Sequence, residues 1–328
     1  MDSRTHLIVL AVAIAIEAAF GYPPSIFKTI RHPVIWIGAL IALLDRSLNR
    51  EVFSDSLRRF SGVLALVILL AIPVGLATIV ATILASALPH VGAMLLIAIA
   101  ASSLIAQRSL WDHVSAVATA LEREGLPASR LAVARIVGRN PETLDEAGVA
   151  RAAIESLAEN FSDGVVAPAF WCALFGLPGI AAYKSVNTAD SMIGHRTPRH
   201  QAFGWASARF DDLVNLPASR LSALWIALAA SIDPKLDARG AINSIHRDAG
   251  KHRSLNAGWP EAAMAGALGL RLAGPRTYGT VKIDDVWMGD GRADANAADI
   301  RRALALYRNA CTIQFAAIAI LAALIAQV

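Results

Sequence analysis

Charged residues are scarce in this chain: they make up 17% of its 328 residues, whereas 55% are hydrophobic. A soluble globular domain carries nearer a quarter charged residues, so an ordinary soluble globule is not expected. The mean hydropathy of +0.50 also excludes a disordered chain, which would contain few hydrophobic residues. The chain has only two cysteines, Cys172 and Cys311, and both stand in apolar runs, which excludes a scaffold stabilised by disulfides.

The sequence also lacks blocks of basic residues. Its formal net charge of +4 comes from 30 Lys and Arg residues that are scattered among 26 acids. Nucleic-acid binding is therefore not expected, because a nucleic-acid partner would select a clustered basic surface. The basic excess is better explained by the orientation of a membrane protein, since Lys and Arg collect in cytoplasmic loops.

Long uncharged runs predict membrane spans, each of which needs about 20 mostly apolar residues. From Phe60 to Gln107 the sole ionisable residue is His90, which stands beside Pro89, so two spans joined by a tight turn are expected there. The predicted fold class is all-α: a polytopic integral membrane protein with four transmembrane helices, two further segments that are broken, re-entrant or additional spans, and helical polar blocks at the cytoplasmic face. The predicted spans are 7–27, 60–88, 91–107 and 309–328, and the further segments are 164–183 and 213–232.

Two features of these runs leave alternatives open. The segment 164–183 has no charge but contains Gly176 and Pro178, which is typical of a broken membrane segment whose freed backbone groups are satisfied inside protein or against a cavity. The first span carries Glu17. This acid is either a buried functional group or a solvated residue at the lipid interface.

The basic residues predict how the chain is oriented. Residues 28–59 carry six Lys or Arg residues against three acids, and the positive-inside rule places this stretch, and residues 108–163 after it, in the cytoplasm. We therefore expect a multi-pass protein of the cell inner membrane with its active site on the cytoplasmic side. No Pro/Ser/Gly linker interrupts the chain, so residues 1–328 are expected to form a single membrane-embedded catalytic domain.

The polar block at 108–163 predicts two helices. Apolar residues recur at a spacing of three to four from Leu110 to Leu121, and Gly125 and Pro127 break the pattern. A second helix is expected to begin near Pro141, with acids in its first turn.

The familiar catalytic motifs are missing from the sequence. It has no P-loop, no complete dinucleotide fingerprint, no His-Glu-x-x-His, no zinc-binding Cys/His cluster and no Gly-x-Ser-x-Gly elbow. What remains is a set rich in carboxylates and amides, which suits a hard cation such as Mg²⁺ and a phosphate.

The densest part of that set lies between residues 155 and 220. Glu155 and Glu159 stand four apart on a predicted helix and so project from one face. Such a pair is ordinarily a solvated surface, but these acids flank apolar membrane segments, where a polar group is unfavourable by several kcal/mol unless it faces a polar cavity. The residues alone leave a metal–phosphate site and a solvated face both open. The polar residues that follow are Asn160, Asp163, Lys184, Asn187, Thr188, Asp190, Arg209, Asp211, Asp212, Asn215 and Arg220.

A separate polar cluster, later in the chain, precedes a helix that is expected to begin near Pro260. Its basic residues and its Gly/Asn turn predict either an anion-binding site or a basic loop that meets lipid headgroups. Its members are Arg247, Lys251, His252, Arg253, Asn256 and Glu261.

The order of these motifs resembles the adenosylcobinamide-phosphate synthases, the CobD/CbiB family of cobalamin biosynthesis. The first matching strings are Arg151-Ala-Ala-Ile-Glu155-Ser-Leu-Ala-Glu159-Asn160, Asp163-Gly-Val-Val-Ala-Pro168 and Tyr183-Lys184-x-x-Asn187-Thr188-x-Asp190-Ser191-Met192. The others are Ala208-Arg209-x-Asp211-Asp212-x-x-Asn215-x-Pro217-x-Arg220, Asn256-Ala-Gly-Trp-Pro260-Glu261 and the N-terminal His32-Pro33-Val34. The chain departs from the family pattern at Tyr22, where an aspartate is usual.

The resemblance implies an ATP-dependent amide ligase. It would join adenosylcobyric acid to (R)-1-amino-2-propanol O-2-phosphate, or to aminopropanol, and release adenosylcobinamide phosphate. ATP and Mg²⁺ are the implied cofactors, and the lipid bilayer is the implied environment. The resemblance leaves room for association with other late enzymes of the pathway and for homo-oligomers.

The resemblance also suggests site residues by role. The expected catalytic residues are Glu155, Glu159, Asp163, Lys184 and Asp190, and the expected Mg²⁺ ligands are Glu159, Asp163, Asp190 and Asp211. The expected substrate-binding residues are Asn160, Asn187, Thr188, Arg209, Asn215, Arg220, Arg247, Lys251, His252, Asn256 and Glu261. Two other classes remain as alternatives: a corrinoid-binding transporter or scaffold without catalysis, and a membrane phosphotransferase that acts on lipid alcohols.

Overall fold

A computed structural model describes residues 2–23, 28–29, 31–138, 140–278, 281–283 and 285–325. The predicted spans 7–27 and 309–328 end at residues that lie outside this described part. The chain divides into two compact units, and each is described here by itself. Unit 1 comprises residues 1–106, 167–215 and 318–328, and unit 2 comprises residues 107–166 and 216–317. The single catalytic domain stays a prediction.

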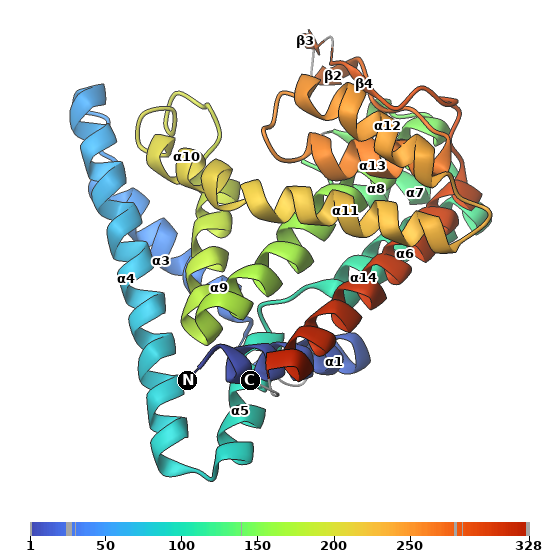
Figure 1. Cartoon of the computed structure of the whole chain (residues 1–328). Coiled ribbons are helices and arrows are strands. Elements are labelled where there is room, and N and C mark those ends of the chain that lie inside the picture. The colour runs from blue at the N-terminus through green and yellow to red at the C-terminus, as the bar shows by residue number, and fades with distance from the viewer. Residues whose placement is uncertain are drawn as a thin grey trace. The chain divides into compact units, whose positions relative to one another are not determined.

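Unit 1 is built mainly from long helices, which Figure 1 shows in blue, cyan and green, together with the shorter α10 in yellow. They are α1 (Ser3–Phe20), α3 (Pro33–Leu48), α4 (Asp55–Ala87), α5 (His90–Ser102), α9 (Ala167–Ile193) and α10 (Trp205–Val214). The side chain of Asp2 caps α1 and that of Ser54 caps α4, each by accepting a hydrogen bond from a first-turn N–H. Pro89 directly precedes α5, which confirms the predicted tight turn.

Two apolar cores hold unit 1 together. In the first, α1, α5 and α9 pack against one another through residues such as Leu10, Ile97 and Ile180. In the second, α3, α4 and the end of α9 enclose Ile41 and Phe203. Gly62 permits this second contact, because a Cβ at that position would lie 2.0 Å from the carbonyl oxygen of Phe203.

Unit 2 is a bundle of shorter helices with small strand pairs. Its elements up to the π-helical turn η2 are α6 (Gln107–Arg123), α7 (Leu126–Val133), η1 (Pro141–Thr143), α8 (Glu146–Phe161) and η2 (Ser162–Val166). The later helices are α11 (Leu216–Ile232), α12 (Ala238–Asp248), η3 (Ala249–Lys251), α13 (Gly258–Leu268) and α14 (Ala297–Ile325), whose last turns belong to unit 1. The helices α11, α12 and α13 pack together.

In the described part of the segment between α13 and α14 there are four short strands. The antiparallel partners are β1 (Leu272–Ala273) with β4 (Trp287–Met288) and β2 (Arg276–Tyr278) with β3 (Val281–Ile283). The sequence analysis did not predict them, because two- and three-residue strands are too short to show an alternating pattern. They leave the helical character of the protein unchanged.

The helices confirm a polytopic membrane protein. Among the residues that the structure describes, five helices are by length and composition long and apolar enough to cross a membrane, or six if the bent pair α10 and α11 forms one span. The five are Ser3–Phe20, Asp55–Ala87, His90–Arg123, Glu146–Ile193 and Ala297–Ile325. Two predicted spans were too short at their N-terminal ends. The helix α4 begins five residues before the predicted span 60–88, and α14 begins twelve residues before the predicted span 309–328. Glu17 is buried among helices rather than exposed.

One predicted helix start was wrong. Residues 141–143 form a single 3₁₀ turn, and the long helix begins at Glu146. Leu144 is extended, and the carboxylate of Asp145 then accepts a hydrogen bond from the Gly148 N–H at 2.7 Å. This N-cap gives the helix a better start than Pro141 does, because it satisfies a backbone N–H that would otherwise lack a partner.

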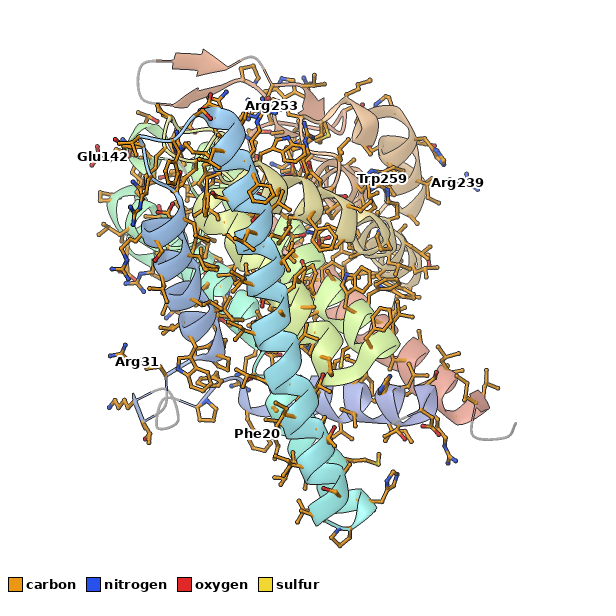
Figure 2. All side chains as sticks on the ribbon, turned by 90° about the vertical axis from the view of Figure 1, so that its left-hand side faces the viewer. Phe20, Arg31, Glu142, Arg239, Arg253 and Trp259 are labelled. Atoms are coloured by element: carbon orange, nitrogen blue, oxygen red, sulfur yellow. The ribbon has the colours of Figure 1, made fainter. Side chains whose placement is uncertain are left out.

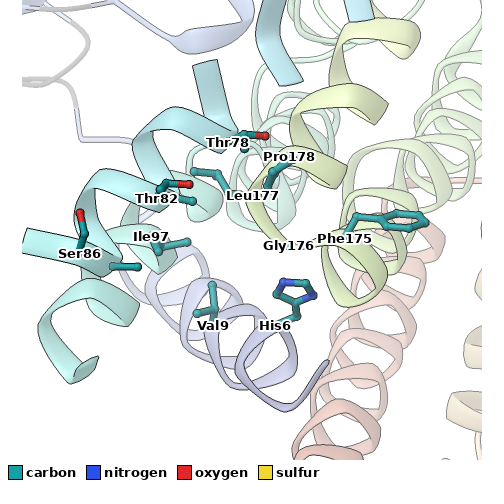
Figure 3. A pocket seen from close by; sticks show the side chains of 12 residues that line it. His6, Val9, Thr78, Thr82, Ser86, Ile97, Phe175, Gly176, Leu177 and Pro178 are labelled. Carbon is teal, nitrogen blue, oxygen red and sulfur yellow. The ribbon is translucent and has the colours of Figure 1, made fainter. Parts of the chain in front are cut away.

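The predicted break in the segment 164–183 is present. Gly176 has φ 64° and ψ −148°, a conformation that interrupts α9, and Pro178 follows in the first turn of the second half. A cavity of about 460 Å³ lies at this break, lined by α1, α4, α5 and α9 (Figure 3). His6, Thr78 and Thr82 supply polar groups to the cavity wall. A helix break inside a membrane span requires such a surrounding, because freed backbone groups need polar neighbours.

Candidate functional site

In unit 1, the second half of α9 carries a row of predicted site residues. Lys184 donates a hydrogen bond from Nζ to Oδ1 of Asn187 at 3.4 Å, and Thr188 donates to the Lys184 carbonyl oxygen at 2.6 Å. Asp190 follows Asn187 by three residues on the same helix, and it lies within electrostatic range of Asp211 and Asp212 on α10. The structure therefore brings the acids of two separate motifs together.

A chain of buried hydrogen bonds connects α9 to α10. The Tyr183 hydroxyl donates to Oδ1 of Asn215 at 2.9 Å, and Nδ2 of Asn215 donates to Oδ2 of Asp211 at 2.9 Å. The exposed fractions of Tyr183, Asn215 and Asp211 are 2%, 1% and 8%. Because Asn215 accepts from the tyrosine with its oxygen, its NH₂ group must point at Asp211. Its predicted contact with substrate stays a prediction.

The Asp211 carboxylate has an unusual environment. Its Oδ1 is buried and has no hydrogen-bond partner within the described residues, although the amide of Asn187 lies close to the carboxylate. Asp190 adds a second negative charge nearby. A buried, repelled carboxylate oxygen is stabilised by a cation, so Asp190 and Asp211 fit the chemistry of a Mg²⁺ site.

The four-acid metal set stays a prediction. Asp190 and Asp211 belong to unit 1, whereas Glu159 and Asp163 belong to unit 2. Among the residues that the structure describes, no group of three or more His, Cys, Asp and Glu side chains could hold a metal ion. Mg²⁺ commonly uses one or two carboxylates together with phosphate oxygens and water, which is the number of acids that Asp190 and Asp211 would supply.

On α10, Arg209 forms an ion pair with Asp212, three residues further along the same helix. Its NH1 lies 3.4 Å from Oδ2 of Asp212, and more than half of its side chain is exposed. An exposed pair of this kind contributes little to stability. The predicted contact of Arg209 with substrate stays a prediction.

In unit 2, the acids of the first motif lie at an irregular helix end. The helix α8 passes into the π-helical turn η2, in which Asp163 is the second residue. Turns of this kind are rare and often occur at functional sites. Glu155 is buried, and its Oε1 accepts a hydrogen bond from the Ala273 N–H at 2.9 Å, which fixes β1 on α8. Glu155 therefore has a structural contact, and its catalytic role stays a prediction.

Arg220 and the loop before α13 form a second polar cluster in unit 2. NH1 of Arg220 donates to Oδ1 of Asn256 at 3.0 Å, and its guanidinium lies over the ring of Trp259, a residue that Figure 2 labels, at 4.4 Å. Nε2 of His252 lies 3.8 Å from Oε2 of the buried Glu261. Four of the predicted substrate-binding residues are thus brought close to the start of α13.

Two predicted anion-binding residues are already paired with an acid. Asp248 is buried and accepts hydrogen bonds from Arg247, from Lys251 at 3.4 Å and from the Gly289 N–H at 3.0 Å. Burial raises the pKa of Asp248, but the hydrogen bonds from Arg247 and Gly289 lower it more, so the pKa lies below its usual value. Arg247 also contacts Asp290. These contacts are those of a structural ion-pair cluster.

A polar network in unit 1 contains residues for which the sequence predicted no role. Asp45 accepts from Arg199 at 2.9 Å and from Asn49 at 2.7 Å, and Arg58 donates to both Asn49 and the Arg199 carbonyl oxygen. Burial raises the pKa of Asp45, but the hydrogen bonds from Asn49 and Arg199 lower it by more, so the pKa lies below its usual value. The network fixes the loop between α9 and α10 to α3 and α4 through Arg199.

His32 is a further residue to which no role was assigned. Its Nδ1 accepts a hydrogen bond from the Val34 N–H at 3.2 Å, so it caps the start of α3. Burial and the positive charge of Lys184 both lower the pKa of His32, which places its ring near that lysine. The motif His32-Pro33-Val34 was the available signal.

Sequence comparison identifies relatives of this chain. A family model described as CobD/Cbib protein matches residues 10–307. The chain belongs to the CobD/CbiB family. Relatives named Cobalamin biosynthesis protein CobD include one from Rhizobium meliloti (strain 1021), which is 51% identical over 315 residues and 95% of each chain.

Two further relatives with the same name extend the similarity across other genera. One from Rhodobacter capsulatus is 51% identical over 302 residues, 92% of this chain and 93% of the relative. One from Brucella melitensis is 47% identical over 305 residues, 92% of each chain. No solved structure matches the chain. The family match covers both units and every predicted site residue.

Proposed function

We propose that this protein is the membrane enzyme of cobalamin biosynthesis that joins adenosylcobyric acid to aminopropanol phosphate. The observation that carries the proposal is the family match over residues 10–307, together with relatives of about half identity that bear the cobalamin-biosynthesis name. The cluster of acids, amides and a lysine on α9 and α10, in which Asp211 and Asn215 are buried, supports catalysis rather than passive binding.

The proposed reaction forms an amide from a carboxylate and an amine. At neutral pH the carboxylate must first be activated, because a carboxylate oxygen is a poor leaving group. A carboxylate oxygen of the corrinoid attacks the γ-phosphorus of ATP, the bond to the β-phosphate oxygen breaks, and ADP leaves. The amine nitrogen then attacks the acyl carbon of the resulting acyl phosphate, inorganic phosphate leaves, and the amine proton passes to a protein carboxylate.

Residues of the chain supply the charges that this chemistry needs. Asp190 and Asp211 would hold Mg²⁺, which when bound supplies positive charge beside the phosphoryl group. Lys184 and Arg209 carry positive charge on α9 and α10 and would neutralise phosphate oxygens. Glu159 and Asp163 remain the candidates for the base that takes the ammonium proton. The Asn187 amide, next to Lys184, would orient a substrate amide.

The setting of the reaction is also part of the proposal. The basic stretch 28–59 favours the cytoplasmic side of the cell inner membrane for the site. ATP would then be available from the cytoplasm. Association with other late pathway enzymes would place successive reactions side by side, and the chain would also associate with further copies of itself.

The proposal is tested by amide formation with the purified full-length chain in detergent. Adenosylcobyric acid, aminopropanol phosphate, ATP and Mg²⁺ are supplied, and adenosylcobinamide phosphate and ADP are quantified by chromatography. We expect equimolar product and ADP, and no product when ATP, Mg²⁺ or the amine is omitted. Corrinoid binding with no ATP consumption would contradict the ligase and favour a transporter or scaffold.

Matched variants connect the activity to the site. We expect Asp190→Asn and Glu159→Gln each to lower kcat by about 100-fold or more, because each removes one charge with little change of shape. Asp112→Asn is the control, since this exposed residue of α6 has only a 3.9 Å contact with Arg108. Wild-type turnover in both site variants would remove these residues from the mechanism.

A further inference from the structure

Arg220 is held in one orientation by a set of protein acceptors. It lies in the first turn and a half of α11, and its NH1 donates to the Leu216 carbonyl oxygen at 3.3 Å, to Oγ of Ser219 at 2.9 Å and to Oδ1 of Asn256 at 3.0 Å. Ser219 and Asn256 are themselves buried. The three acceptors fix one corner of the guanidinium group.

An aromatic ring fixes the plane of the same group. The guanidinium carbon of Arg220 lies 4.4 Å from the centroid of the Trp259 ring, well within the range of a cation–π contact. Other stacked arginines in unit 2 lie farther from their rings, at 5.8 Å for Arg151 on Trp287 and 5.9 Å for Arg308 on Trp111. The Arg220 side chain is therefore ordered both along its edge and across its face.

The remaining edge of Arg220 has no partner. Within the described residues, its Nε and NH2 make no hydrogen bond and no ion pair. Other arginines of unit 2 differ, since Arg247, Arg292 and Arg301 each lie 2.6–2.9 Å from a carboxylate oxygen. A half-buried, oriented guanidinium with a free pair of donors is the geometry that binds an oxyanion through two parallel hydrogen bonds.

We propose that the Nε–NH2 edge of Arg220 binds the phosphate monoester of the amine substrate. This assignment rests on the proposed function, in which two reactants carry phosphate: the phosphorylated amino alcohol and ATP. A phosphate monoester has three free oxygens at one end, so two of them meet the guanidinium donors while the amine stays free to react. Trp259 excludes water from one face of the contact, which strengthens the charge-assisted hydrogen bonds.

Three variants of the full-length chain test the assignment. Arg220→Lys keeps the charge but loses the two-donor edge, and Trp259→Phe weakens the stacking. Arg308→Lys is the matched control, because Arg308 also stacks on a tryptophan but is exposed. For each protein, the KM values for aminopropanol phosphate and for ATP are measured separately. The shift of the thermal unfolding midpoint by aminopropanol phosphate and by inorganic phosphate is measured as a readout that needs no turnover.

We expect Arg220→Lys to raise the KM for aminopropanol phosphate about tenfold or more, with the KM for ATP within twofold of wild type. Trp259→Phe raises the same KM by a smaller factor, and Arg308→Lys leaves both constants unchanged. The stabilisation of the wild-type chain by aminopropanol phosphate, and more weakly by inorganic phosphate, is lost in Arg220→Lys. If Arg220→Lys does not fold, the Trp259→Phe result decides in its place.

The outcomes separate this inference from the proposed function. A rise in the KM for ATP alone would overturn the assignment to the monoester and give the site to the nucleotide. Unchanged KM values and an unchanged midpoint shift would overturn the site altogether. If the wild-type chain makes no amide, the proposed function fails, and the midpoint shifts still decide whether Arg220 binds a phosphate monoester.

Discussion

Tyr183→Phe is the substitution that most directly tests the arrangement of the α9 and α10 acids. It removes one hydroxyl oxygen and leaves the ring in place. That hydroxyl donates to Oδ1 of Asn215 at 2.9 Å, and the Asn215 amide in turn donates to Asp211 at 2.9 Å. Without the tyrosine donor, Oδ1 of the buried Asn215 loses this hydrogen bond, and the amide that donates to Asp211 is held less firmly in its orientation.

The expected size of the effect follows from these contacts. A buried hydrogen bond contributes about 1 kcal/mol net, and leaving its acceptor unsatisfied costs about 1–3 kcal/mol. The free energy of unfolding should fall by an amount in that range. Loss of a residue that orients a metal ligand typically lowers activity or metal affinity about 10- to 100-fold. We therefore expect kcat to fall at least about tenfold and the Mg²⁺ concentration for half-maximal rate to rise.

A matched variant separates positioning from stability. Tyr307 is equally buried, and its hydroxyl donates to the Gln107 carbonyl oxygen at 2.8 Å in unit 2. Tyr307→Phe should lower stability by a similar amount and leave the Mg²⁺ dependence unchanged. The assay is product formation across a Mg²⁺ titration, with thermal unfolding measured on the same detergent samples. Equal loss of activity in both variants, or a wild-type Mg²⁺ dependence in Tyr183→Phe, would refute the reasoning.

Two further predictions concern stability. Gly62→Ala should destabilise unit 1 by about 1–3 kcal/mol, because its Cβ would lie 2.0 Å from the Phe203 carbonyl oxygen. Gly75→Ala in the same helix is the control: its Cβ would meet nothing within 4 Å, so it should be neutral or stabilising. Thermal unfolding of both variants measures the difference, and equal unfolding midpoints would contradict the close approach at Gly62. Asp248→Asn should cost about 2 kcal/mol at pH 7. Because the folded-state pKa of Asp248 lies below its usual value of 3.8, the stabilising contribution of the carboxylate is present above that value and is lost as the pH falls through the folded-state pKa. The gap between the wild type and Asp248→Asn should therefore shrink as the pH falls below about 4, and a gap that stays constant would show that the charge of Asp248 is not its source.

The membrane helices could be predicted because their signal is local. An uncharged run of sufficient length, such as residues 60–88, has one stable form in a bilayer, and Gly176 with Pro178 marks a break that is present in α9. The boundaries were less predictable, since Asp55 and Arg58 are charged yet helical. Charged residues can extend a membrane helix into the polar interface at little cost, so an apolar run understates its length.

The polar network around Asp45 could not be predicted, because its members are far apart in the sequence. Asp45 and Arg199 are separated by 154 residues, and neither belongs to a motif with a recognisable spacing. The proximity of Asp190 to Asp211 was predicted only as a hypothesis that separate motifs converge, and the structure shows it within unit 1. The unpartnered edge of Arg220 likewise depends on which acceptors fold against NH1, and the sequence does not specify them.

The orphaned oxygen of Asp211 bears on how metal and nucleotide would bind. When Asp211 and Asp190 are both ionised, their negative charges repel each other, and the pair is unfavourable unless a cation binds between them. An asparagine in place of Asp211 would fill the same volume without this charge. With two acids, Mg²⁺ would take its other ligands from phosphate and water. Metal affinity should therefore be weak without ATP and rise with it, because the nucleotide completes the coordination sphere that the two aspartates begin.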